Sequence, residues 1–369
     1  MFLSKPFSWF SARALRYGVI VMTVLLYAAF GGGHAAAGGA GEADGESAAQ
    51  RDGAGTSQVT DELIVYTYDA FPEGLEEVLV DYFDREYSVS VTVERFQDTG
   101  GLFNEVMLTR GEGAADLVIG LDNTYIGRAL EADLFQPTEP AEIDAVREDL
   151  ILDESNRLVP FDYGNIVLNY DSQALSDPPT TWEELLDPSL RESIVLMNPA
   201  TSSPGRNFLL LTIEQFGEDG YLDFWEELEP NILTITSGWS DGYGLYTQGE
   251  APIVLSYETS PAFHIAYEDT DRYKNLILDE VGYAQIEVMG VLQDAPNREN
   301  AHRAVDFILS TEFQSEIALN QFMYPVREDV ELPDSFQQLH RPEETRFIDI
   351  DTVDANYERW LDDWEAVMR

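Results

Sequence analysis

The sequence predicts an α/β protein of two lobes, each a mainly parallel sheet flanked by helices, joined by a hinge where the chain crosses twice. Three observations predict this fold. Strands and helices alternate from residue 62 onward, and about 310 residues follow the polar N-terminal segment, too many for one comfortable core. Two apolar strands, 165–170 and 283–292, stand where the chain would leave and re-enter the first lobe. We therefore expect one lobe from 61–163 plus 286–369 and the other from 164–285.

The first lobe opens with a strand–helix–strand series. The segment 73–87 predicts a helix because Leu75, Leu79 and Phe83 recur on one helical face. The residues around 89–93 alternate apolar and polar side chains, as a strand does. The full expected series consists of strands over 62–66, 89–93 and 116–120 and helices over 73–87 and 101–110. In such sheets ligands bind outside the carboxyl ends of the strands.

The second lobe repeats the alternation. We expect strands over 194–197, 232–236 and 253–257, and helices over 182–186 and 204–215, after Trp239, and from Pro261. Helices over 298–309 and 312–319 then complete the first lobe. In the C-terminal segment Tyr357, Trp360 and Trp364 recur at helical spacing, which indicates packing.

The N-terminal sixty residues predict export and a tether. Basic side chains precede an apolar run of fourteen residues, 17–30, and small residues at 35–37 suit a signal peptidase. We interpret 1–37 as a signal peptide that directs the chain to the periplasm, with an uncleaved membrane anchor as the alternative, although a span needs about 20 residues. Residues 38–60 predict a flexible acidic linker.

Composition excludes several classes of function. The formal net charge is −48, and without residues 1–37, which hold three basic residues, 18 basic residues face 69 acidic ones. The remaining charge of −51 makes nucleic acid and anionic lipid poor partners. There is no cysteine, which excludes disulfides, thiolate metal sites and cysteine nucleophiles. An acidic surface is typical of a protein that faces a salty exterior.

Aromatic, small and hydroxyl residues gather at the ends of two predicted strands, in 237–245 and 255–264. This composition suits a flat organic cation, because aromatic faces attract positive charge. It favours a binding protein over an enzyme.

Together with other motifs, these segments resemble the periplasmic thiamine-binding proteins of ABC transporters, which have the type II periplasmic-binding-protein fold. The motifs are YTYDAF (66–71), GLDN (120–123), VPFDYG (159–164), TSSPG (201–205), GWSDGYG (238–244), LSY with TSPA (255–262) and MYPV (323–326). The resemblance implies a solute-binding protein that captures thiamine, thiamine monophosphate or thiamine diphosphate and delivers it to an inner-membrane ABC permease. Such a protein is not an enzyme. The resemblance further implies a monomer without cofactor, metal or catalytic residues.

The resemblance also implies a set of ligand-binding residues. The ligand would be contacted by the aromatic rings of Tyr68, Trp239, Tyr257 and Phe263, and by Phe322 in the loop before Met323. Asp98 would face the ligand with its carboxylate, and Ser202 and Gly205 would contact its phosphate group. Relatives tend to have tyrosine at position 263 and tryptophan at position 322, so both phenylalanines lose a polar edge.

Neighbouring polar residues have open interpretations. Ser203 is expected to cap the helix that Pro204 begins, and Arg206 either adds a charge to the site or faces solvent. Asp69, Asp122 and Asp162 either face the ligand or brace their loops.

Rival functions remain to be compared. Type I thiaminase shares this fold but needs a cysteine nucleophile. Four histidines and no Gly-x-Ser-x-Gly motif give weak support to a serine hydrolase, and His264 is interpreted as a packed or rim residue. A polyamine or ferric-ion carrier on the same fold stays the alternative, with Tyr66 and Tyr68 as the nearest approach to an iron-binding pair.

Overall fold

The computed structural model describes residues 61–368. The predicted signal peptide, anchor alternative and linker lie outside the described residues. Among residues 61–368, no helix combines the length and apolar character needed to span a bilayer.

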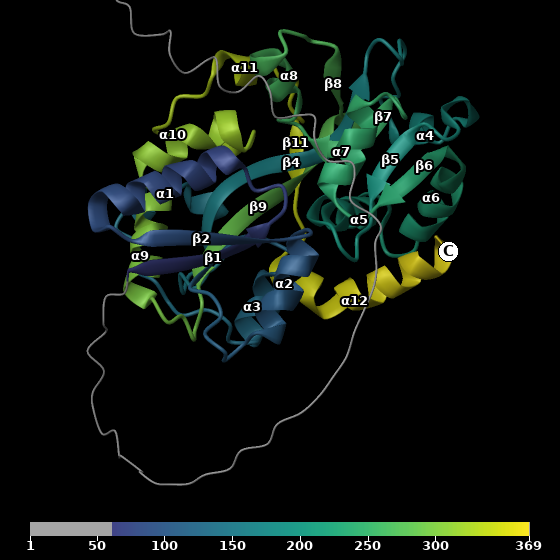
Figure 1. Cartoon of the computed structure of the whole chain (residues 1–369). Coiled ribbons are helices and arrows are strands. Elements are labelled where there is room, and N and C mark those ends of the chain that lie inside the picture. The colour runs from purple at the N-terminus through teal and green to yellow at the C-terminus, as the bar shows by residue number, and fades with distance from the viewer. Residues whose placement is uncertain (1–60, 369) are drawn as a thin grey trace, which may run out of the picture. The chain divides into compact units, whose positions relative to one another are not determined.

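The described strands form one mixed sheet of eleven strands (Figure 1). Its main order is β2-β1-β3-β9-β4-β7-β5-β6, while β8 and β10 pair with β4 and β11 pairs with β9. Two groups of three parallel strands, β2-β1-β3 and β7-β5-β6, therefore stand on either side of the central pair β9 and β4. The alternation of strand and helix seen in the sequence corresponds to these two groups.

The first group follows the predicted order. Its strands are β1 (Glu62–Tyr68), β2 (Ser90–Phe96) and β3 (Leu117–Asp122), and its helices are α1 (Glu73–Tyr87), α2 (Thr99–Leu108) and α3 (Ile126–Glu131). Helix α1 has the predicted bounds because its buried residues Leu75, Leu79 and Phe83 do form one face against the core. Helix α2 begins two residues before the predicted start, since Asp98 caps it.

The second group contains strands β5 (Ile194–Met197), β6 (Ile232–Thr236) and β7 (Ile253–Tyr257). Its helices are α4 (Trp182–Leu185), α5 (Ser203–Phe216), α6 (Tyr221–Leu228), α7 (Trp239–Thr247) and α8 (Pro261–Tyr267). The short strand β8 (Tyr273–Leu276) pairs antiparallel with β4. Helix α6 was not predicted from the sequence. Its buried face consists of Tyr221, Phe224, Trp225 and Leu228.

The two central strands carry the chain between the groups. Strand β4 (Val159–Asp171) starts six residues earlier than the predicted 165–170, so the motif VPFDYG is itself strand. It pairs antiparallel with β9 (Val281–Val291) from Val159 to Ile166. Both strands contribute to two hydrophobic cores: Phe161 and Ile286 belong to the first, and Ile166 and Tyr283 to the second. The change of core on both strands supports the predicted two-crossing hinge.

The C-terminal part returns to the first core and then leaves it. Helices α9 (Arg298–Ile308) and α10 (Thr311–Asn320) precede β10 (Tyr324–Pro325), α11 (Asp334–Gln337), β11 (Glu344–Arg346) and α12 (Ile350–Val367). The side chains that α12 buries, among them Trp360 and Trp364, belong to the second core. The expected lobe boundary assigned 286–369 as a whole to the first lobe. Among the apolar side chains of α12, Ile350 packs against the first core, while Val353, Tyr357, Trp360 and Trp364 belong to the second.

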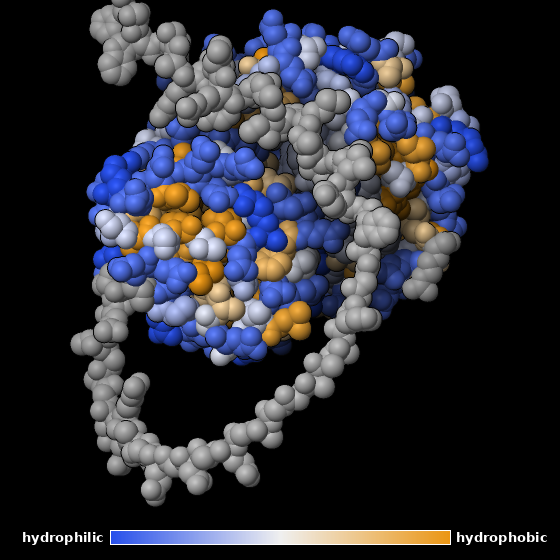
Figure 2. All heavy atoms as spheres, viewed as in Figure 1, coloured by the Kyte–Doolittle hydropathy of each residue, from blue (hydrophilic) through white to orange (hydrophobic). Residues whose placement is uncertain are grey.

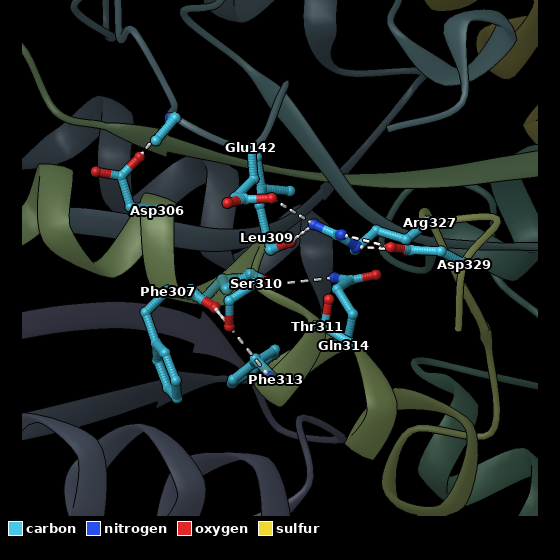
Figure 3. A network of polar contacts seen from close by, with 12 residues as sticks. Glu142, Asp306, Phe307, Leu309, Ser310, Thr311, Phe313, Gln314, Arg327 and Asp329 are labelled. Carbon is cyan, nitrogen blue, oxygen red and sulfur yellow. Dashed lines mark hydrogen bonds and ion pairs between the residues drawn. The ribbon is translucent and has the colours of Figure 1, made fainter. Parts of the chain in front are cut away.

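A polar network surrounds the start of α10 and Arg327 (Figure 3), and Gln314 connects α10 to the central strand β4. The side-chain amide of Gln314 donates to the backbone oxygen of Phe161 on β4 at 2.9 Å, and its oxygen accepts from Val326 N–H at 2.8 Å. Beside it, the Arg327 guanidinium donates to Glu142, Asp329 and the backbone oxygen of Leu309. Buried hydrogen bonds of this kind hold one end of β4 in place.

Hydrophilic residues cover most of the face visible in Figure 2, in keeping with the acidic composition. An apolar area interrupts them over β1 and the edge strand β2.

Candidate ligand-binding site

A cavity of about 300 Å³ lies at the carboxyl ends of both groups of parallel strands. This is within the range of small-molecule sites. The first group contributes residues after β1 and before α2, and the second contributes the starts of α5, α7 and α8. The lining residues are Tyr68, Asp69, Ala70, Pro72, Asp98, Thr99, Ser203, Pro204, Trp239, Tyr243, Tyr257, Ser260, Phe263, Glu287, Asn320, Gln321, Phe322 and Met323. Six of the eight residues predicted for the site are among them.

A stacked pair of rings forms one part of the aromatic lining. The rings of Trp239 and Tyr243 lie 4.7 Å apart at 19°, and Tyr257 is tilted against Trp239 at 6.4 Å. The Trp239 indole N–H donates to Ser256 at 2.9 Å, which fixes the ring plane. Tyr243 was not predicted, although it follows Trp239 by four residues and so lies on the same face of α7.

Tyr243 is held from behind by His264. Its hydroxyl lies 2.9 Å from Nε2 of His264, whose Nδ1 lies 2.6 Å from Glu268. His264 is buried and does not line the cavity, so its interpretation as a packed residue is confirmed. Burial lowers the pKa of His264, which favours the neutral ring.

Asp98 connects the two sides of the cavity. Its carboxylate accepts from the backbone N–H of Thr99 at 2.7 Å, as the cap of α2, and from that of Trp239 at 3.3 Å. Burial raises the pKa of Asp98 to about 6, against the lowering effect of these two N–H groups. Gly238 permits the approach, because a Cβ there would lie 3.0 Å from Oδ2 of Asp98.

A chain of hydrogen bonds joins Tyr68 to Tyr257 below the aromatic pair. The Tyr68 hydroxyl donates to Glu287 at 2.7 Å, and Gln285 donates to Glu287 at 3.1 Å and to the Tyr257 hydroxyl at 2.7 Å. Gln321 donates to the Tyr68 hydroxyl from the other side. Glu287 was not predicted, although Tyr283, Gln285 and Glu287 alternate along one strand as residues on one face do.

The start of α5 differs from the prediction by one residue. Ser202, not Ser203, is the N-cap, and its hydroxyl makes no capping bond. Ser203 and Pro204 line the cavity, whereas Ser202 and Gly205 do not. Gly205 packs against the preceding strand, where a Cβ would lie 2.3 Å from the backbone oxygen of Met197. A helix turns about 100° per residue, so Ser203 and Gly205, two positions apart, point to opposite sides of α5.

Two other polar residues near α5 brace the fold. Asp122 accepts from the Ser203 hydroxyl and from the N–H and hydroxyl of Thr124, so it holds its own loop and α5. Arg206 is buried rather than solvent-facing, with its guanidinium over the rings of Tyr125 and Tyr357, and it does not line the cavity. Of the other two aspartates left open, Asp69 lines the cavity and Asp162 lies buried on β4.

Phe263 and Phe322 meet at the cavity, with ring centroids 5.2 Å apart at 81°. Phe322 has φ +55°, a left-handed backbone that a non-glycine residue rarely adopts. This geometry turns the chain between α10 and β10 and puts Gln321, Phe322 and Met323 into the lining.

The lining is acidic. It contains three carboxyl side chains, those of Asp69, Asp98 and Glu287, and none of these described lining residues is basic. Among residues 61–368, no group of three or more His, Asp or Glu side chains is arranged to hold a metal ion. The arrangement suits an aromatic ligand that carries positive charge.

Comparison with known proteins agrees with this geometry. Residues 112–356 match the family described as bacterial extracellular solute-binding proteins. The chain is 34% identical over 313 residues to the thiamine-binding periplasmic protein of Brucella abortus, covering 84% of this chain and 93% of that one. It is 33% identical over 308 residues to the thiamine-binding periplasmic protein of Escherichia coli K12, covering 83% and 93%. A solved structure of a periplasmic thiamin binding protein superposes with a TM-score of 0.77 at 31% identity, over 84% of this chain and 96% of that one. The chain therefore belongs to the bacterial extracellular solute-binding proteins, in the same family as the thiamine-binding periplasmic proteins.

Proposed function

We propose that this protein is the solute-binding component of an ABC importer, that it captures thiamine in the cavity, and that it delivers thiamine to a permease in the inner membrane. One observation carries the proposal: a stacked Trp239–Tyr243 pair lines the same cavity as three carboxyl groups. Thiamine offers a flat aminopyrimidine and a thiazolium ring with a fixed positive charge, which match these two features. The names of the relatives point to the same ligand.

The proposed mechanism is closure around the ligand. The cavity takes residues from both groups of strands, so a ligand that contacts both favours the closed arrangement by its differential contacts. The central strands β4 and β9 would carry the motion as the hinge. The permease would then recognise the closed protein, which we propose acts as a monomer in the periplasm.

The acidic lining bears on the choice among thiamine compounds. Thiamine carries a positive charge, whereas the phosphate groups of its monophosphate and diphosphate add negative charge, which the three carboxyl groups disfavour. The start of α5, with the positive end of the helix dipole, is the place where a phosphate group would be received. We propose the order of affinity thiamine, then monophosphate, then diphosphate.

Titration of the purified mature protein, followed by tryptophan fluorescence and calorimetry, tests the proposal. Of the tryptophans in residues 61–368, Trp239 lines the cavity, while Trp182, Trp225, Trp360 and Trp364 are buried in the second core. Thiamine is expected to quench fluorescence in the natural protein, and in Trp239→Phe the signal should disappear while calorimetry still records binding, weakened about tenfold. Binding of spermidine or ferric ion without binding of any thiamine compound would overturn the proposed function.

A further inference from the structure

Two acidic residues face each other across the central strands. Asp162 on β4 and Glu287 on β9 are direct partners in the antiparallel register, beside the point where the pairing slips by one residue. Directly opposed residues of a sheet project to the same face, with Cβ atoms roughly 5 Å apart. Their neighbours along the strands, Phe161, Ile286 and Val288, belong to the first hydrophobic core.

The pair is buried and poorly compensated. Asp162 is fully buried, and neither of its carboxyl oxygens has a hydrogen-bond partner among the described residues. Glu287 is 4% exposed and accepts hydrogen bonds from Tyr68 and Gln285. The titratable groups that face the pair from the surrounding elements are Tyr68 on β1, Asp98 before α2, Asp122 on β3 and Tyr257 on β7. None of these described groups is a cation.

Two negative charges in this position would be costly. Like charges directly opposite each other destabilise a sheet, and an unpaired buried carboxylate loses its hydration without compensation. Burial raises the pKa of Glu287 to about 8, with the carboxyl groups of Asp122 and Asp98 adding to the effect. Burial and the charge of Glu287 raise the pKa of Asp162 well above its ordinary value. Burial, the opposed positions of the two carboxyl groups and the lack of a hydrogen-bond partner for Asp162 therefore all favour a proton on the empty pair.

Glu287 also lines the cavity, so the pair is in contact with the ligand space. We propose that Asp162 and Glu287 hold a shared proton in the empty protein and release it to solvent when a cation enters the cavity, which makes the pair the determinant of selectivity for positively charged ligands. The inference rests on the proposed function for the identity of the cation. The ligand's charge takes the place of the proton's charge, and a neutral molecule of the same shape provides no such replacement.

The direction of the pH dependence follows from this exchange. Because binding releases a proton, affinity for thiamine rises with pH, by up to about tenfold per pH unit where a whole proton is released. The rise ends above the pKa of the empty pair. At pH 7.5 Asp98, with its pKa of about 6, is already ionised for the most part, so the proton released there comes from the pair.

Calorimetry at pH 7.5 in two buffers of different ionisation enthalpy counts the protons released. The ligands are thiamine and deazathiamine, a neutral isostere in which a thiophene ring replaces the thiazolium while the aminopyrimidine is kept. We expect thiamine to release more than half a proton and deazathiamine to release almost none, with thiamine bound at least tenfold tighter. This comparison uses the natural protein and needs no variant.

Variants then locate the proton. Glu287→Gln keeps an acceptor for Tyr68 and should abolish proton release and reduce the preference for thiamine over deazathiamine at least fivefold. Asp162→Asn should have the same two effects on proton release and on ligand preference, although Asp162 does not line the cavity. Glu139→Gln, the same chemical change on an exposed loop, is the matched control and should change neither quantity.

The outcomes separate this inference from the proposed function. Tight thiamine binding without proton release, or with release and selectivity unchanged in Glu287→Gln, overturns the role of the pair and leaves the proposed function intact. If thiamine does not bind and spermidine does, the proposed function is wrong, and proton release on spermidine binding then decides the role of the pair.

Discussion

Gly120 holds Tyr68 in the cavity, and replacing it tests the geometry of the site. Gly120 lies on β3 with φ +98°, at the position where the register of β3 and β9 slips. A Cβ at this position would lie 2.1 Å from Cε1 and 2.3 Å from Cδ1 of Tyr68. Real side-chain contacts do not reach such distances, so Gly120→Ala must displace the Tyr68 ring. Tyr68 is 6% exposed and bonded to Glu287 and Gln321, so it has little free space to move into.

The magnitude has two contributions. An alanine in a left-handed backbone costs about 1–2 kcal/mol, and an added methyl group in a packed site costs about 1–3 kcal/mol. Gly120→Ala should therefore lower the free energy of unfolding by about 2–5 kcal/mol. Gly111→Ala provides the matched control, since Gly111 has φ +82° but no atom within 4 Å of the added Cβ. It should lose about 1–2 kcal/mol from the backbone alone.

Urea denaturation of both variants and calorimetric titration with thiamine measure the two effects. We expect Gly120→Ala to bind thiamine at least tenfold more weakly and Gly111→Ala to bind it normally. Equal loss of stability in the two variants would refute the steric reasoning. A large loss of stability with unchanged thiamine affinity would show instead that the Tyr68 ring does not contact the ligand.

Three other predictions follow. Glu287→Gln should stabilise the empty protein at pH 8 and leave its stability nearly unchanged at pH 5. The native pKa of Glu287 is about 8 and its ordinary value is 4.5, so the natural protein loses stability as pH rises between these values, whereas the variant does not. Urea denaturation should show a gain on the order of a few kcal/mol at pH 8, and an equal gain at both pH values would contradict this reasoning. Asp98→Asn removes the charge and keeps one of the two N–H contacts, because the amide nitrogen that replaces one oxygen cannot accept a hydrogen bond. Thiamine should therefore bind about tenfold more weakly at pH 7, and the additional loss of affinity below about pH 6, beyond the loss due to the Asp162–Glu287 pair, should disappear. A titration series from pH 5 to 8 measures this, and an additional loss that persists in the variant assigns it to another group. Phe263→Tyr and Phe322→Trp each add a polar edge to the cavity lining. One added hydrogen bond should tighten thiamine binding about two- to tenfold, as measured by calorimetry. Weaker binding in both variants would mean that phenylalanine suits this cavity better at these positions.

Local patterns account for the elements that sequence reasoning predicted well. Helix α1 has the predicted bounds because its apolar residues follow the helical period, and β5 and β6 are continuous apolar or β-branched runs. The resemblance implied that Tyr68, Trp239 and Tyr257 share a site, and each of them stands at or just after the end of a strand. Parallel strands bring their carboxyl ends to one edge, so this grouping follows from the fold class.

Other elements lacked a local signal. Strands β8, β10 and β11 have two to four residues and exist because they pair with β4 or β9, far away in sequence. Ser202 and Ser203 are adjacent in sequence, and the rotation of α5 decides which of them reaches the cavity. Short strands and side-chain directions depend on partners that a local pattern does not contain.

The sequence by itself determined the two-lobed α/β architecture, the absence of thiol chemistry, the acidity of the chain and the aromatic residues at the strand ends, since each of these depends on composition or on a local period. Only the tertiary structure decided that Tyr243 stacks on Trp239, that Asp98 bonds to the start of α7, and that Asp162 faces Glu287. The last two of these contacts join residues from separate elements, and Asp162 and Glu287 are 125 positions apart in the sequence. The register of β4 against β9 opposes these two acids, and burial, rather than residue type, then gives the pair its affinity for a proton.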